Sequence, residues 1–280
     1  MSFSVNTNGN ALAAIETLNL TQQQMSRVQG EVSSGYAVNS AAADASTFAI
    51  AQQQRGSIAG FQSISTSLGM GTALTNVALQ GAQTISNLLN QIEAKVIQAE
   101  DPSQNATLIG TAVTALISQV TSTALAANFN GVNLISASTG STAAGNQTVL
   151  SSLNGTGTST AVAFITLTGQ GLNATSLGIN SISITSAATA SAALSLVLSA
   201  ASTVQTALAD LGTSSNQIQT QTNFVTTLTN SLTTGVGDLV DANLASASAQ
   251  LQALQTKQQL GIQALSIANQ GPSAILALFR

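Results

Sequence analysis

The stretch FQSISTSLGMGTALTNVALQGAQTISNLLNQIEAKVIQA, residues 61–99, decides the fold of this chain. Its apolar or small residues recur in alternating steps of three and four, and they are Phe61, Ile64, Leu68, Gly71, Thr75, Ala78, Ala82, Ile85, Leu89, Ile92, Val96 and Ala99. This spacing places a single stripe along a helix and makes that stripe a seam for a second helix. The sequence therefore predicts a long helix that packs lengthwise.

A second run of the same kind lies in the C-terminal half. Its members are Leu194, Val197, Ala201, Val204, Leu208, Leu211, Ser215, Ile218, Thr222, Val225, Thr229, Leu232, Val236 and Leu239. The polar members Ser215, Thr222 and Thr229 are either small packing residues or residues that select the pairing register. Helices of this length bury little in a compact domain, so we expect each to need a partner helix or a neighbouring copy of the chain.

Capping residues and breakers set the limits of the N-terminal helices. Asn8 or Asn10 is predicted to cap a first helix that Gly35 ends. A second helix is expected to begin near Asp44 or Ser46 and to continue to residue 100, where Asp-Pro breaks it. A third helix is predicted from about 105 to 128, before a turn in which Asn and Gly tolerate positive φ.

The middle of the chain differs in composition. Residues 133–185 are rich in Gly, Ser, Thr and Asn, with short alternating apolar pieces at 162–167 and 182–184, which we interpret as strands. A long helix is then expected from about 186 to 269, with a possible interruption at 233–237, and Gly271-Pro272 is expected to end it. Helices at the two ends of the chain, joined through a middle that turns back, should lie antiparallel. The predicted fold class is mainly α: long antiparallel helices forming a rod-like coiled-coil bundle, with a small β-rich segment.

The composition argues against several classes of partner. Charged residues make up 5% of the chain and its five cations are dispersed, whereas nucleic-acid binding needs clustered Lys and Arg. Membrane insertion is not expected, because Ser and Thr interrupt the most apolar segment, residues 190–204, which falls short of the roughly 20 apolar residues of a span. Residues 1–10 lack a basic and an apolar region, so any export should use an address other than a cleaved signal.

An enzymatic role is not expected either. The chain has no His and no Cys, so the usual bases, thiol nucleophiles and metal ligands are missing, and no cofactor is predicted. Asp238 and Asp241 lie three residues apart on a predicted helix, a spacing typical of solvated acids on a helix face. We therefore expect a structural or binding role.

Three segments of the sequence resemble bacterial flagellins. Residues 33–45, SSGYAVNSAAADA, are similar to the N-terminal signature of that family, and FNGVNL at 129–134 is similar to its Phe-Asn-Gly motif. The most specific likeness is LGIQALSIANQ at 260–270, followed by the terminal Leu-Phe-Arg. Together the likeness covers residues 1–135 and 185–280 in the right order.

The resemblance implies a subunit that polymerises into the extracellular bacterial flagellar filament used for swimming. It implies an inner helical core domain made of residues 1–45 with 236–280, and a helical rod domain of residues 46–235 that includes a β-rich segment at about 133–185. The implied partners are the chain itself, an export chaperone, the flagellar export apparatus, and the filament cap and junction proteins. No large outer domain is expected in the short middle.

Polymerisation should use the apolar stripes at the two ends of the chain. The expected interface residues are Leu12, Ile15, Leu18, Met25, Val28, Val32, Leu244, Leu251, Leu254, Leu265, Ile275, Leu278 and Phe279.

Two other functions are compatible with parts of this pattern. A hook-filament junction protein shares flagellin-like ends, and a helical type III secreted translocator also lacks a cleaved signal. The strong C-terminal likeness and the short middle favour flagellin over the first. The second would need an uninterrupted apolar hairpin, which the sequence does not contain.

Overall fold

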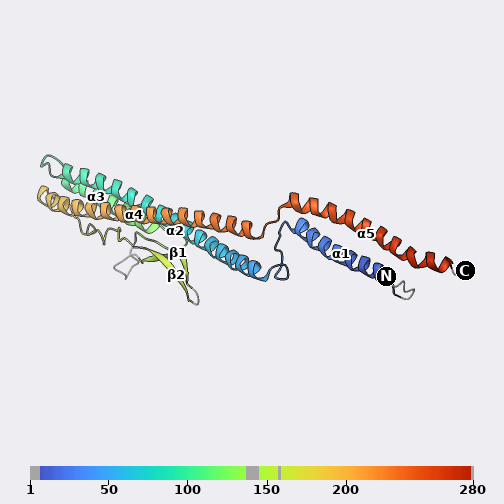
Figure 1. Cartoon of the computed structure of the whole chain (residues 1–280). Helices are drawn as coiled ribbons and strands as arrows, with labels where there is room; N and C mark the ends of the chain where they lie inside the picture. The colour runs from blue at the N-terminus through green and yellow to red at the C-terminus, as the bar shows by residue number, and fades with distance from the viewer. Residues whose placement is uncertain (1–6, 137–144, 157–158, 279–280) are drawn as a thin grey trace. The chain divides into compact units, whose positions relative to one another are not determined.

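The computed structural model describes residues 7–136, 145–156 and 159–278 and is mainly helical (Figure 1). The elements in chain order are α1 (Gly9–Ser34), α2 (Ala45–Ala99), α3 (Ala106–Ala126), β1 (Gln147–Thr156), β2 (Ser159–Leu167), α4 (Ala187–Val240) and α5 (Leu244–Leu278). The predicted fold class, long helices with a small β-rich segment in the middle of the chain, is confirmed.

Contacts divide the chain into two units. The first unit comprises Met1–Ile58 with Ser231–Arg280, and the second comprises Ala59–Asn230. Because α2 and α4 extend across these limits in sequence, each helix supplies residues to both units. The first unit thus combines the two ends of the chain.

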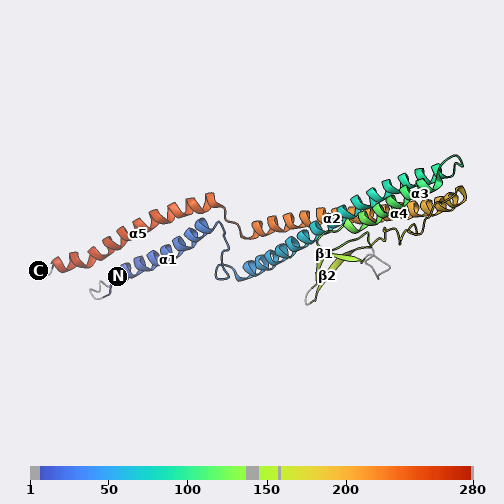
Figure 2. The same cartoon turned by 180° about the vertical axis from the view of Figure 1, so that it is seen from behind.

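In the first unit, α1 lies beside α5, as both views of the molecule show (Figures 1 and 2). The pairing is antiparallel: Asn8 bonds to Ala268, whereas Gln22, further along α1, bonds to Gln258, which comes earlier in α5. The expected antiparallel arrangement of the terminal helices is confirmed.

In the second unit, the seven-residue repeats read from the sequence form the core. Every member of the predicted stripe between Phe61 and Ala99 is buried. The buried residues of α4 include a strict heptad series, and it consists of Val197, Val204, Leu211, Ile218 and Val225. The polar positions Thr222 and Thr229 are half-buried, and each hydroxyl donates to the carbonyl four residues earlier at 2.8 Å. This local bonding favours the interpretation that they are small packing residues.

The two strands form an antiparallel hairpin that is tied to helices of the second unit. The register runs from Gln147 opposite Leu167 to Thr156 opposite Ser159, with an irregularity between Leu150 and Ser152. At this bulge the Leu150 amide donates to Ser67 Oγ of α2 at 3.1 Å, and Gln221 Nε2 of α4 donates to the Ser151 carbonyl at 2.8 Å. The bulge therefore frees backbone groups that the helices take up.

The turn after α3 has the backbone conformation that its sequence predicts. Asn130 and Gly131 have φ of 51° and 80°, and the backbone groups of Phe129 and Val132 bond to each other in both directions. Asn133 then closes the end of α3, because its Nδ2 donates to the Ala124 carbonyl at 2.7 Å. This bond satisfies one of the carbonyls that a helix end leaves without a partner.

Residues 168–186 are irregular, so the strand expected at 182–184 is wrong. Ile182 and Ile184 are buried, as a strand interpretation would require, but they pack without joining a ladder. The carbonyl of Ile184 instead lies against Gly110 of α3, where it leaves no room for a Cβ atom. Side-chain burial alone could not distinguish this packed irregular segment from a strand.

The interruption of the C-terminal helix falls at residues 241–243 and not at 233–237. Its cause is backbone pairing with the segment after α1: Ala37 donates to the Val240 carbonyl at 2.8 Å, and Ala242 donates to the Gly35 carbonyl at 2.9 Å. These bonds use groups that a continuous helix would need. Asn243 then caps α5 by accepting from the Ser246 amide at 3.1 Å.

The expectation that Gly271-Pro272 ends the last helix is also wrong, because α5 continues to Leu278. Proline has no amide hydrogen, so in a continuous helix Pro272 leaves the Ala268 carbonyl without its usual partner. The side chain of Asn8 donates to that carbonyl at 2.8 Å. A partner from another helix thus supplies the missing donor.

Two helices, α3 and α4, are apolar and long enough to cross a membrane on length and composition alone. In the apolar segment of each helix, 28% of the residues are buried in the structure, and those of α4 include members of the heptad series named above.

Candidate subunit interface

Helix α1 begins and ends at the residues that its sequence indicates. Asn8 Oδ1 accepts from the Ala11 amide at 3.1 Å, which caps the first turn. Gly35 has a φ of 76° and its amide donates to the Glu31 carbonyl at 2.9 Å, which is the left-handed ending that glycine allows. Both limits of the predicted first helix are confirmed.

The contact between α1 and α5 is built from small residues as well as apolar ones. On α1 the buried residues are Ala11, Thr21 and Val28, and on α5 Ala247 is buried. A Cβ atom at Gly261 would lie 3.4 Å from Leu18 Cδ1, which is an ordinary packing distance, so Leu18 contacts α5 at this position. We call this set of contacts the α1–α5 seam.

Two side-chain hydrogen bonds cross the α1–α5 seam. Asn8 Nδ2 donates to the Ala268 carbonyl at 2.8 Å, and Gln258 Nε2 donates to Gln22 Oε1 at 2.6 Å. Because hydrogen bonds depend on position and direction, these links favour one pairing register.

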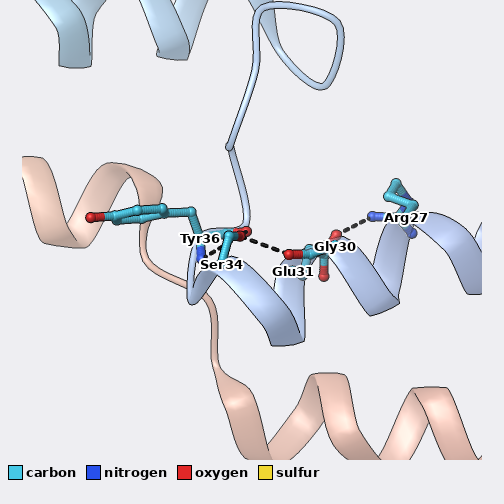
Figure 3. A network of polar contacts seen from close by, with 5 residues as sticks. All are labelled: Arg27, Gly30, Glu31, Ser34 and Tyr36. Atoms are coloured by element: carbon cyan, nitrogen blue, oxygen red, sulfur yellow. Dashed lines mark hydrogen bonds and ion pairs between the residues drawn. The ribbon is translucent and has the colours of Figure 1, made fainter.

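A polar network holds the end of α1 in place (Figure 3). Arg27 forms an ion pair with Glu31 at 2.8 Å, and Ser34 Oγ donates to the Gly30 carbonyl at 2.7 Å. The Tyr36 amide donates to Ser34 Oγ at 3.2 Å. The bonds at Ser34 fix the chain direction immediately after the helix.

Tyr36 also contacts α2 and the break before α5. The guanidinium carbon of Arg55 lies 5.2 Å from the Tyr36 ring centroid, within the range of a cation–π contact. The backbone of Tyr36 forms an antiparallel bridge with Asp241. Tyr36 thus connects the end of α1, the helix α2 and the interruption between α4 and α5, all within the first unit.

The start of α2 is fixed by Asp44. The hydroxyl and the amide of Thr47, together with those of Ser46, donate to this carboxylate and hold the pKa of Asp44 at about 2, below its usual 3.8. Hydrogen bonds to the charged form favour that form. Asp44 is therefore ionised at neutral pH and caps α2 as a carboxylate.

The predicted interface residues fall into three groups. Those partly or fully buried within the single chain are Leu18, Met25, Val28, Val32, Leu251, Leu254 and Leu265. Those exposed in the single chain are Leu12, Ile15 and Leu244. Ile275 and Leu278 belong to the C-terminal part of α5, and Phe279 lies outside the described residues.

The apolar spacing of the sequence does not identify every residue of α1 and α5 that lies in or beside the seam. The small or polar seam positions Ala11, Thr21 and Ala247 repeat at the same heptad spacing as their apolar neighbours, which is the signal that could have identified them. Besides Leu12, Ile15 and Leu244, four more large apolar side chains are exposed on α1 and α5, and they are Leu20, Leu260, Ile262 and Ile267. They lie outside the apolar stripe of their helix, so a pattern that follows one stripe does not include them.

The arrangement of α1 and α5 offers a packing surface. Within the described ranges, no group of three or more acidic residues is placed to hold a metal ion. The exposed apolar side chains include Leu12, 61% exposed, and Ile267, 70% exposed. Among the described residues, seven large apolar side chains are exposed on α1 and α5 together, and exposed apolar surface of this kind can bind another protein.

Comparison with known families places both ends of the chain in one group of proteins. Residues 5–140 match the bacterial flagellin N-terminal helical region, and residues 194–279 match the bacterial flagellin C-terminal helical region. Flagellins FljM and FljK of Caulobacter vibrioides are each 39% identical to this chain, over 99% of its length and 98% of theirs. A flagellin of Brucella melitensis is 32% identical, over 99% of both chains.

Proposed function

The chain belongs to the bacterial flagellin family, and on that premise we propose that its α1–α5 pair is the surface through which copies of the chain join in the filament. Like its family, the chain is a structural subunit of the extracellular flagellar filament and not an enzyme. The observation that carries this function is the match at both ends of the chain together with relatives that align over nearly its whole length.

Two sets of residues should have different roles in assembly. The α1–α5 seam, with Leu18, Val28 and Leu265, joins the two ends of one chain. The exposed apolar residues Leu12, Ile15, Leu20, Leu244, Leu260, Ile262 and Ile267 then contact neighbouring subunits. Burying such side chains stabilises an interface by about 25 cal/mol for each Å² of apolar area.

We further propose that residues 1–45 with 236–280 form the inner helical layer and that residues 46–235 form the layer around it. A repeated contact that does not close on itself builds a helical filament from identical copies. Before and during assembly, the chain would meet an export chaperone, the export apparatus, and the cap and junction proteins. We propose these partners because the chain belongs to the flagellin family.

The direct test is assembly of the purified chain. Copies at increasing concentration should form long uniform filaments in electron micrographs, and size exclusion should show loss of monomer above a critical concentration. Leu12→Ser combined with Ile267→Ser should raise that concentration, whereas Ser33→Ala on exposed α1 surface should not. Closed rings or monomers at every concentration would refute the proposal that the chain forms a filament. They would favour a hook-filament junction protein or a type III secreted translocator instead.

A further inference from the structure

Asn8 makes two different hydrogen bonds with the two atoms of its side-chain amide. Its oxygen accepts from the Ala11 amide at 3.1 Å and caps α1. Its nitrogen donates to the Ala268 carbonyl of α5 at 2.8 Å. A helix cap needs the oxygen alone, so the second bond calls for a separate explanation.

The explanation lies four residues further along α5. In a continuous helix the carbonyl of residue 268 accepts from the amide of residue 272, but proline occupies that position and has no amide hydrogen. The Ala268 carbonyl is therefore open to an outside donor. Asn8 supplies one from the N-cap position that precedes α1.

This bond lies beside the surface assigned above to subunit contacts. Leu12 is one turn from Asn8, and Ile267 is adjacent to Ala268; both side chains are exposed. The α1–α5 seam contains small residues such as Ala11 and Gly261 beside larger ones such as Leu18, and a second polar link, from Gln258 to Gln22, crosses it further along. A single polar pair can set the register of two paired helices.

We propose that Asn8 and Pro272 act together as a register lock: Pro272 frees one carbonyl of α5, and Asn8 binds it, which aligns the apolar side chains that α1 and α5 present to the next subunit. This role rests on the proposed polymerisation. Asn8 is a positioning residue, since it acts through the alignment of Leu12 and Ile267.

A double-mutant cycle separates this role from simple helix capping. Asn8→Ser keeps a capping oxygen but is too short to reach Ala268, and Pro272→Ala returns an amide to the Ala268 carbonyl. Asn8→Ser should raise the critical concentration for assembly about fivefold when residue 272 is proline, as expected for one lost hydrogen bond. In the Pro272→Ala chain the same substitution should change it less than about twofold, because the carbonyl has its own helical donor.

Asn10→Ser is the matched control, since Asn10 is exposed on the same turn, and it should leave the critical concentration unchanged in both backgrounds. An equal effect of Asn8→Ser in both backgrounds, or no effect in either, would overturn the lock while leaving filament formation intact. Failure of the unmodified chain to assemble would instead refute the proposed function and the lock with it.

A second measurement does not depend on the variants. Solid-state NMR of labelled wild-type filaments should show a through-space correlation between Asn8 Nδ2 and the Ala268 carbonyl carbon. Its absence from otherwise well-resolved spectra would overturn the proposal.

Discussion

At Gly110, α3 approaches the irregular segment 168–186 so closely that no side chain fits. A Cβ atom there would collide with the Ile184 carbonyl oxygen, which belongs to the backbone and cannot rotate away. At Gly69 in α2, by contrast, nothing lies within 4 Å of the same atom. Two helical glycines in the second unit thus differ, because one faces a backbone carbonyl and the other faces open space.

The first prediction compares these two positions. Gly110→Ala should lower the free energy of unfolding by about 2 kcal/mol, as overpacking of a close contact does. Gly69→Ala should raise it by about 0.5 to 1 kcal/mol, because alanine favours an exposed helix interior. Chemical denaturation of the monomer, followed by circular dichroism, measures both. Changes of the same sign would contradict the assigned contact at Gly110.

The second prediction concerns pH and Asp44. Its pKa is lowered by the bonds from Thr47 and Ser46, so its contribution to stability is complete above its usual value of 3.8 and is lost as the pH falls through about 2. NMR titration of the monomer should give a midpoint near 2 for this carboxyl group and shift the amides of residues 46 and 47 together with it. Ser46→Ala with Thr47→Val removes the hydroxyl donors and should move the midpoint upward. A midpoint near 3.8 in the unmodified chain would be evidence against the capping bonds.

At the scale of helices and strands, the sequence predicts the features that repeat along the chain. It does not predict helix limits that depend on backbone groups far away in the sequence. The heptad stripe of residues 61–99 is buried throughout because periodicity states directly which face of a helix meets a partner. The helix break at 241–243 depends on amides from residues 37 and 242, and continuation of α5 through Pro272 coincides with a donor from Asn8. A local sequence pattern around the break or around Pro272 does not include these hydrogen-bond donors.

The same limit applies to the predicted interface. Spacing identified Val28 and Leu265 as parts of a stripe, but it could not distinguish residues that pack within one chain from exposed ones such as Leu12 and Ile15. That distinction depends on the direction in which α5 returns along α1.

The third prediction concerns how the hairpin is held to α4. Gln221→Ala removes the donor to the Ser151 carbonyl at the bulge and should lower the free energy of unfolding by about 1 kcal/mol, the usual net contribution of one hydrogen bond. Amide exchange in β1 and β2 should become faster. Gln219→Ala is the control, because Gln219 bonds to Asn223 within α4 and is exposed. Equal effects at both positions would mean that the hairpin does not depend on this bond.

For the whole molecule, the scarcity of charge limits what can hold an assembly together. Within the described ranges the ion pair is Arg27 with Glu31, four residues apart on α1, and the two side chains are 63% and 13% exposed. Ion pairs with this spacing on a helix contribute about 0.3 to 0.5 kcal/mol. Cohesion between and within subunits should therefore come from apolar burial and from close approach of small side chains.

The last prediction follows from that balance. Filament melting temperature should change little between about 0.05 and 0.5 M salt, because screening acts on charges and not on apolar contacts. Leu265→Asp places a carboxylate in the partly buried α1–α5 seam and should cost about 3 kcal/mol for each subunit, enough to prevent assembly. Lys257→Ala, on an exposed position of the same helix, should assemble normally. If Lys257→Ala dissolved filaments while Leu265→Asp left them intact, charge pairing between subunits would have to replace the apolar seam as the source of cohesion.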